Sequence, residues 1–176
     1  MAELTVRLGR PGEELAIAKV HVETWQTAYR GIVPDDFLDA MDVALRARNY
    51  SDDMLTDPDR PMWVAERERI VGFTGAGPSR DADGEGELYA IYIDASEWGR
   101  GTGDVLMVAA LDHLRPRFDA ATLWVLESER SRAKVLREVR MVLRRHRRRL
   151  RVRRFRDPGS PLPDRSHVRR SSRSAQ

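Results

Sequence analysis

The 176-residue sequence contains no cysteine, and only Lys19 and Lys134 are lysines. Without cysteine the chain forms no disulfide bonds and offers no thiolate ligands to a metal. Its four histidines are scattered and show no metal-site spacing, so we expect no metal cofactor. No apolar run approaches the roughly 20 residues of a membrane span, and the N-terminus lacks a basic stretch followed by an apolar one. These absences predict a cytoplasmic protein with no membrane partner.

Charge is divided unevenly along the chain. The formal net charge is +3, yet residues 128–176 contain 18 arginines and lysines against 4 acidic residues. Residues 1–127 contain 13 against 24. The total length suits one domain with a sizeable core. We therefore expect a domain over residues 1–127, followed by an arginine-rich tail over 128–176 whose composition is typical of disorder.

The order of apolar patterns indicates an α/β fold. Two strands joined by a tight turn come first and predict an antiparallel hairpin. A strand, a helix and another strand follow, and this order predicts a parallel pair joined by a crossover helix. Together they favour a mixed central sheet with flanking helices. The valines between residues 134 and 150 also have the spacing of a helix. Strands are predicted over 4–8, 62–66, 70–76, 87–94 and 121–127, and helices over 13–29, 34–41, 44–55 and 105–114.

A glycine-rich turn, Trp98-Gly-Arg-Gly-Thr-Gly103, separates the strand over 87–94 from the helix over 105–114. Such an arrangement leaves backbone N–H groups free at the positive end of a helix, where an anionic phosphate binds well. A Walker loop would need Lys and Ser or Thr after its last glycine, and the dinucleotide-binding turn follows the first strand of a parallel sheet. From these residues alone, a tight turn without a ligand is the alternative.

Several blocks of the sequence, in the same order, resemble the GNAT family of N-acetyltransferases. The resemblance covers residues 1 to about 127 and points to the bacterial branch. It implies a GNAT-like mixed sheet with flanking helices, and an enzyme that transfers an acetyl group from acetyl-coenzyme A to a primary amine of an unknown acceptor. The blocks are His21–Gly31, Pro34–Leu38, Leu88–Asp94, Glu97–Leu106 and Thr122–Glu127.

The same resemblance places the coenzyme along the strand and the turn. The backbone of Ile91, Tyr92 and Ile93 is expected to pair with the pantetheine arm, and the Ile93 amide to donate to the thioester oxygen. The family has Gln or Arg where this chain has Trp98, which leaves one side-chain contact open. The backbone expected to hold the diphosphate is that of Gly99, Arg100, Gly101, Thr102, Gly103 and Asp104.

Acetyl transfer to an amine needs a base that removes a proton from the ammonium form. Glu87, eleven residues before Trp98, has the position of the strand glutamate that serves as base in histone-modifying members, and Glu127 is the second candidate. Without a catalytic role, Glu87 would be an exposed charge at a strand edge, and Glu127 would be a solvated residue at the end of a strand. His21, Trp25 and Tyr29 lie on the helix that frames the acceptor pocket in the family; core packing is the alternative for Trp25.

After residue 127 the sequence departs from the family pattern. Members continue with Arg-Phe-Tyr-Glu, whose tyrosine protonates the leaving thiolate, and with two closing strands, whereas this chain has no tyrosine after Tyr92. Suitable codons for Lys134–Val142 encode Arg-Phe-Tyr-Glu-Lys-Cys-Gly-Trp-Ser when read one base later. Those for Phe155–Pro163 similarly encode Ser-Glu-Ile-Pro-Glu-Val-Arg-Tyr. We interpret residues 128–176 as a shifted reading frame, which resequencing of the gene tests, and expect missing closing strands and impaired activity.

A basic-tailed nucleic-acid-binding protein is the alternative function. The arginines of residues 128–176 would bind phosphates in a salt-dependent way that ignores sequence. Phe155 is the only aromatic residue among them, so base stacking is poor and we expect no specific nucleic acid partner. The expected partner is a small-molecule or peptide amine, and the resemblance allows a homodimer formed through sheet edges.

Overall fold

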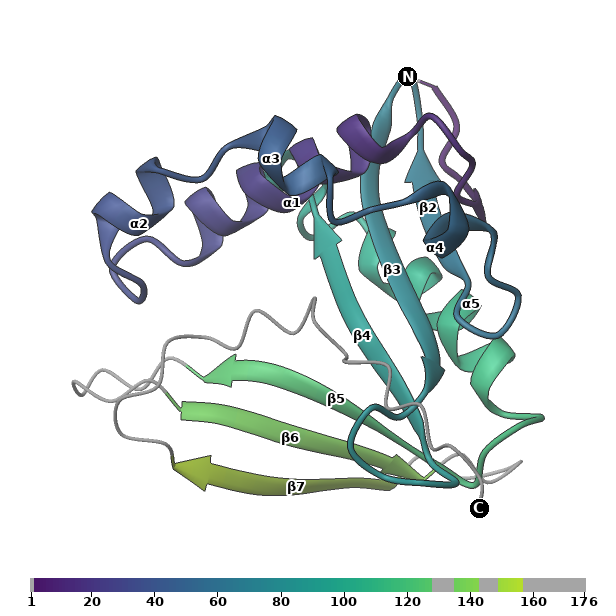
Figure 1. The fold of residues 1–176 in the computed structure, drawn as a ribbon. Coiled ribbons are helices and arrows are strands. Elements are labelled where there is room, and N and C mark those ends of the chain that lie inside the picture. Colours follow the sequence, from purple (N-terminus) through teal and green to yellow (C-terminus); the bar gives the residue numbers. More distant parts are fainter. Residues whose placement is uncertain (1, 128–134, 143–148, 157–176) are drawn as a thin grey trace, which may run out of the picture.

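The computed structural model of the chain describes residues 2–127, 135–142 and 149–156 (Figure 1). Seven strands form one sheet in chain order, β1 (Thr5–Leu8), β2 (Met62–Glu66), β3 (Ile70–Pro78), β4 (Gly86–Ile93), β5 (Ala120–Glu127), β6 (Val135–Val142) and β7 (Arg149–Arg156). The helices are α1 (Glu14–Ala28), α2 (Asp35–Asp39), α3 (Val43–Ala47), α4 (Asp52–Thr56) and α5 (Thr102–Leu114), with a 3-10 turn, η1, over Ala95–Glu97.

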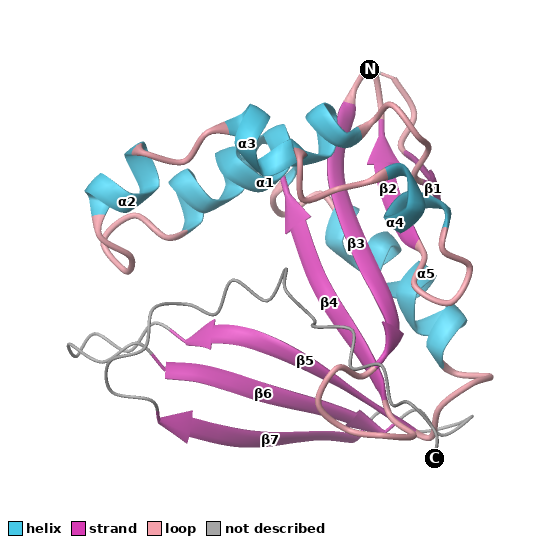
Figure 2. Cartoon of the chain, in the orientation of Figure 1, coloured by secondary structure: helices cyan, strands magenta, loops and turns pink. Residues whose placement is uncertain are grey.

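The sheet combines an antiparallel and a parallel part. Strands β1 to β4 pair in an antiparallel meander, β4 and β5 pair in parallel, and β5 to β7 are again antiparallel. Helix α5 forms the crossover between β4 and β5, as a parallel pair requires. Figure 2 shows α1 and α5 on opposite faces of β3 and β4. The mixed sheet with flanking helices predicted from the sequence is therefore confirmed.

Two apolar layers hold the helices against the sheet. On the α1 face, Ile17 and Val20 pack with Phe73 of β3. On the α5 face, Leu114 packs with Leu88 of β4. Because both faces are covered, eight of the nine residues of β3 are buried, which is typical of a central strand.

Strands β4 and β5 separate soon after they meet. Their pairing is limited to Gly86–Leu88 opposite Ala121–Leu123, and Figure 1 shows the two strands diverging beyond it. A bulge lies at the same point, because Ala76 and Gly75 of β3 face Leu88 and Ala90 and leave Tyr89 without a partner. A bulge bends its strand. The rest of β4 therefore has a free edge on the side from which β5 has departed.

One predicted helix is two helices. The continuous helix expected over 44–55 is wrong, since α3 ends at Ala47 and α4 begins at Asp52. Ser51 has extended backbone angles, φ −93° and ψ 159°, and its hydroxyl accepts a hydrogen bond from the Met54 N–H. Serine favours this N-cap position because its side chain satisfies a helix amide that has no partner in the first turn.

The segment after β5 also differs from expectation. Strands β6 and β7 pair along eight positions, so the predictions of missing closing strands and of a helix over 134–150 are wrong. The alternation of arginine with Leu150 and Val152 has the period of a strand, not that of a helix. Residues 128–134, 143–148 and 157–176 lie outside the described residues, so the division of the chain at residue 127 stays a prediction.

Candidate active site

The glycine turn forms an open cradle at the start of α5. Gly99 and Gly101 have left-handed backbones, with φ of +73° and +82°, which residues other than glycine rarely adopt. No heavy atom lies within 4 Å of the place where a Cβ would stand at either position. Beside the turn is a cavity of about 360 Å³, lined by Ile93, Glu97, Trp98, Asp104 and three glycines of the turn. The amides at the start of α5 suit an anion there.

A buried glutamate holds this turn in shape. Glu97 is 5% exposed, and its carboxylate accepts hydrogen bonds from the Thr102 hydroxyl at 2.8 Å and from Arg67 Nε at 3.0 Å. The hydrogen bond from Thr102 lowers the pKa of Glu97, Arg67 lowers it further, and burial opposes both. Glu97 therefore joins η1 to the first residue of α5, and Arg67 balances its negative charge.

The free edge of β4 runs directly into the turn. The Asp94 N–H donates to Val71 O of β3 at 2.9 Å, and peptide groups along a strand alternate between its two sides. The backbone groups of Ile91 and Ile93 therefore point to the side from which β5 has diverged. By the same alternation the backbone of Tyr92 faces β3. Of the three residues predicted to pair with pantetheine, two have peptide groups on the open edge.

Glu87 is buried in an ion pair near the other end of β4. It is 1% exposed, and the Arg80 backbone N–H and Nε donate to its carboxylate at 3.0 Å and 3.1 Å, together with Arg80 Nη2. The Arg80 guanidinium also lies 4.9 Å from the centre of the Tyr89 ring. The interpretation of Glu87 as an exposed edge charge is therefore wrong.

The two candidate bases lie far apart. Glu87 faces Thr122 across the parallel pair, whereas Glu127 is five residues further along β5, or about 17 Å at the usual rise of a strand. Glu127 is opposite Val135 of β6, and its side chain lies outside the described residues. The structure therefore does not bring Glu87 and Glu127 into one catalytic pair.

An aromatic cluster lies between α1 and β4. His21 stacks on Tyr92 with ring centres 4.6 Å apart, and its Nδ1 is hydrogen-bonded to the Tyr50 hydroxyl at 2.6 Å. Burial, helped by the charge of Arg46, lowers the pKa of His21 to about 3, so this imidazole is neutral at physiological pH. Its neutral form excludes a role as a fixed cation in acceptor binding.

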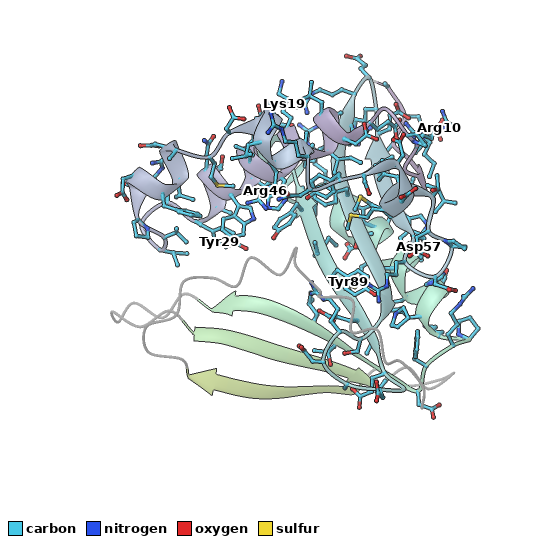
Figure 3. The ribbon with its side chains drawn as sticks, viewed as in Figure 1. Arg10, Lys19, Tyr29, Arg46, Asp57 and Tyr89 are labelled. Carbon is cyan, nitrogen blue, oxygen red and sulfur yellow. The ribbon has the colours of Figure 1, made fainter. Side chains whose placement is uncertain are left out.

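The outer end of this cluster is less covered. Trp25 and Tyr29 meet edge to face with ring centres 4.9 Å apart, and both are half-buried. Figure 3 shows Tyr29 on the side of α1 that faces β5. Trp25 therefore belongs partly to the packing, as its plain interpretation predicts, and Tyr29 lies nearer to the opening between β4 and β5.

Sequence reasoning missed the two arginines that pair with the buried glutamates. Arg67 lies in the turn between β2 and β3, and Arg80 lies in the loop before β4. Arg67 is 30 residues from Glu97 in the chain, so no local pattern links them. Arg80 and Glu87 are seven positions apart in the chain, but a loop lies between them, and neither helical nor strand periodicity applies across it.

Comparison with known proteins gives one consistent family. The family model described as "Acetyltransferase (GNAT) family" matches residues 20–137. The "Uncharacterized N-acetyltransferase YuaI" of Bacillus subtilis is 32% identical over 133 residues, which are 73% of this chain and 75% of YuaI. Over the described residues, no helix has the length and apolarity to cross a bilayer, and no group of three potential metal ligands occurs.

Two solved structures have a similar fold. The PaiA N-acetyltransferase of Thermoplasma acidophilum, in complex with coenzyme A, has a TM-score of 0.59 and 15% identity over 73% of this chain and 82% of its own. YncA of Salmonella typhimurium, with its cofactor acetyl-CoA, has a TM-score of 0.61 and 18% identity over 83% of this chain and 97% of its own. At such low identities the likeness concerns the fold.

Proposed function

Because the chain belongs to the acetyltransferase (GNAT) family, we propose that it transfers an acetyl group from acetyl-coenzyme A to a primary amine of a small molecule or peptide. One observation carries this proposal: the edge of β4 that β5 leaves open leads directly into a glycine cradle at the start of a helix. An extended amide chain that ends in a diphosphate matches both features at once.

The residues present fit such a coenzyme. The peptide groups of Ile91 and the N–H of Ile93 would pair with the amides of pantetheine, as an added strand does, while the Ile93 carbonyl already accepts from Thr24 and Trp98. The backbone amides of Gly99, Gly101, Thr102 and Gly103 would hold the diphosphate, where glycine allows close approach. The Arg100 and Asp104 amides, also expected there from the sequence, instead donate to Glu97 O at 3.2 Å and Gly101 O at 3.0 Å. The Asp104 side chain is exposed, which lets it turn away from a phosphate. When bound, the coenzyme supplies the acetyl thioester.

Glu87 is the proposed base. Since Gly86 and Leu88 face α5, the side chain between them faces α1, the side on which Tyr92 also packs. In the structure Arg80 engages both carboxylate oxygens. Arg80 therefore has to release Glu87 before this carboxylate takes the proton of the acceptor ammonium. The Ile91 amide lies on the same open edge and nearer to Glu87 than the Ile93 amide that the sequence suggested, so it is the proposed donor to the thioester oxygen. Glu127 is the alternative base.

The thiolate that leaves needs a proton as well. The sequence contains no tyrosine after Tyr92, so the acid that the resemblance implies is missing and solvent would supply this proton. We therefore expect slow turnover even where the coenzyme binds, and binding has to be measured separately from activity.

Calorimetric titration with acetyl-coenzyme A, at salt high enough to suppress binding through the arginine-rich segment, tests the proposal. We expect saturable binding by the wild type and a loss of about tenfold or more in Gly101→Ala, because a Cβ there strains the backbone and obstructs the diphosphate. Gly103→Ala should also weaken binding, since its Cβ would lie 2.9 Å from Ile93 Cδ1.

Gly12→Ala is the matched control. Gly12 also has a left-handed backbone, with φ of +89° and open space around it, but it precedes α1 and lies outside the site. It should bear the same backbone strain and keep its affinity. A folded wild-type chain that binds no acetyl-coenzyme A contradicts the proposal. Binding by the wild type justifies a screen of amines with release of coenzyme A thiol as the readout.

A further inference from the structure

Trp98 has an unusual position for a large apolar side chain. It follows η1 at the entry to the glycine turn, and half of its surface, 50%, is exposed. Its indole Nε1 donates to Ile93 O at 3.0 Å, which fixes the ring against the end of β4. Thr24 Oγ1 donates to the same carbonyl at 3.1 Å, so this acceptor is fully used within the chain. The ring is held in place although much of it faces solvent.

Trp98 and Ile93 are the large apolar side chains that line the cavity beside the turn. The other lining groups are glycines, Glu97 and Asp104. The cavity therefore has an apolar wall at the point where the edge of β4 ends, and a wall of peptide groups where α5 begins. A ligand that fills it needs an apolar part next to an anionic part.

Coenzyme A has this order of groups. A pantoyl unit with two methyl groups joins its diphosphate to the amides of pantetheine. On the proposed function, which this inference depends on, the diphosphate lies on the turn and the amides lie along Ile91 and Ile93. The pantoyl unit between them then has to pass the Trp98 ring, whose Nε1 is hydrogen-bonded to Ile93 O.

We propose that Trp98 is a positioning residue for the coenzyme, and that its exposed ring packs against the dimethyl pantoyl unit between pantetheine and diphosphate. In this chain an apolar contact replaces the contact that Gln or Arg makes at the corresponding position in the pattern described above. The hydrogen bond to Ile93 O sets the angle of the ring, and burial of its exposed part provides the affinity.

Three variants and two probes test this inference. Acetyl-coenzyme A contains the pantoyl unit, whereas 3′-phospho-ADP has the adenosine and the diphosphate but lacks that unit. Trp98→Ala should bind acetyl-coenzyme A about tenfold more weakly and bind 3′-phospho-ADP as the wild type does. Trp98→Phe keeps a ring and loses the N–H, so its loss should be smaller. Trp63→Phe, on β2 and outside the cavity, is the control with unchanged affinity.

Tryptophan fluorescence supplies a readout that is independent of activity. Acetyl-coenzyme A should change the emission of the wild type and of Trp63→Phe but not that of Trp98→Phe. Unchanged affinity of Trp98→Ala for acetyl-coenzyme A, or an equal loss for both probes, would overturn the pantoyl contact and leave the proposed function standing. A folded wild type that binds neither probe would overturn the proposed function and this inference together.

Discussion

Each end of β4 has a buried glutamate paired with an arginine, but the two glutamates have different surroundings. Glu97, just after the strand, is 5% exposed and has two kinds of partner, the Thr102 hydroxyl and Arg67. Glu87, at the start of the strand, is 1% exposed, and each of its hydrogen bonds comes from one residue, Arg80. One carboxylate is held by two different residues, and the other by the side chain and the backbone N–H of a single residue.

This difference separates an organising role from a reactive one. The Glu97 carboxylate holds the start of α5 through its hydrogen bond from Thr102. A change in its protonation would therefore alter the glycine turn. The Arg80 guanidinium is partly exposed, so it can move away from Glu87 without rearranging the sheet and leave the carboxylate with the hydrogen bond from the Arg80 backbone N–H. We therefore propose that Glu97 supports the coenzyme cradle, and Glu87 remains the proposed base.

Glu87→Gln should give the largest effect on activity. The amide keeps the shape of the side chain but takes no proton, so kcat should fall by about 100-fold or more with the amine found by the screen. Affinity for acetyl-coenzyme A, measured by calorimetry, should stay the same because Glu87 lies at the far end of the strand from the turn. Glu68→Gln, in the exposed turn between β2 and β3, is the control. A variant with full kcat would transfer the role of base to Glu127 or to solvent.

Replacing the arginine partner of each glutamate should lower the free energy of unfolding by different amounts. Arg80→Gln removes the guanidinium bonds to both oxygens of a carboxylate that is 1% exposed and leaves the single bond from the residue-80 backbone N–H, so we expect a loss of about 3 kcal/mol in the free energy of unfolding. Arg67→Gln leaves Glu97 its hydrogen bond from Thr102, so about 1 kcal/mol should be lost. Urea unfolding of both variants measures the difference. Equal losses would show that Thr102 does not distinguish the two sites.

The strand, the glycine turn and the helix were predictable because each has a local cause. A short continuous apolar run, Leu88–Ile93, marks β4, and glycines at left-handed positions mark the turn. The environment of Glu87 was not predictable, because it depends on how the loop before β4 returns Arg80 to the strand. This return uses the Ser79 N–H, which donates to Glu85 O at 2.8 Å, a contact that no periodic pattern encodes.

The sequence did not predict strands β6 and β7, for a different reason. Arginine is so frequent between residues 144 and 156 that the few apolar residues gave too weak a pattern, and the valines between 134 and 142 also fit a helix. Strand β6 pairs with the preceding strand β5 along Ala120–Glu127, and strand pairing of this kind overrides local spacing. Local sequence patterns predicted the turn because glycine conformation determines its structure. They failed for β6 and β7 because pairing with neighbouring strands determines the structure there.

Acid should distinguish Glu97 from an ordinary surface carboxylate. The pKa of Glu97 in the folded chain is below its ordinary value of 4.5, so ionised Glu97 stabilises the fold above that value. As the pH falls through the lower, folded-state pKa, both states become protonated and this contribution is lost. Glu97→Gln should therefore be less stable than the wild type at pH 7, and the difference should shrink below pH 4.5. Thermal unfolding of both proteins across this range measures the effect. A difference that stays constant with pH would mean that packing around the side chain, and not its charge, holds the turn.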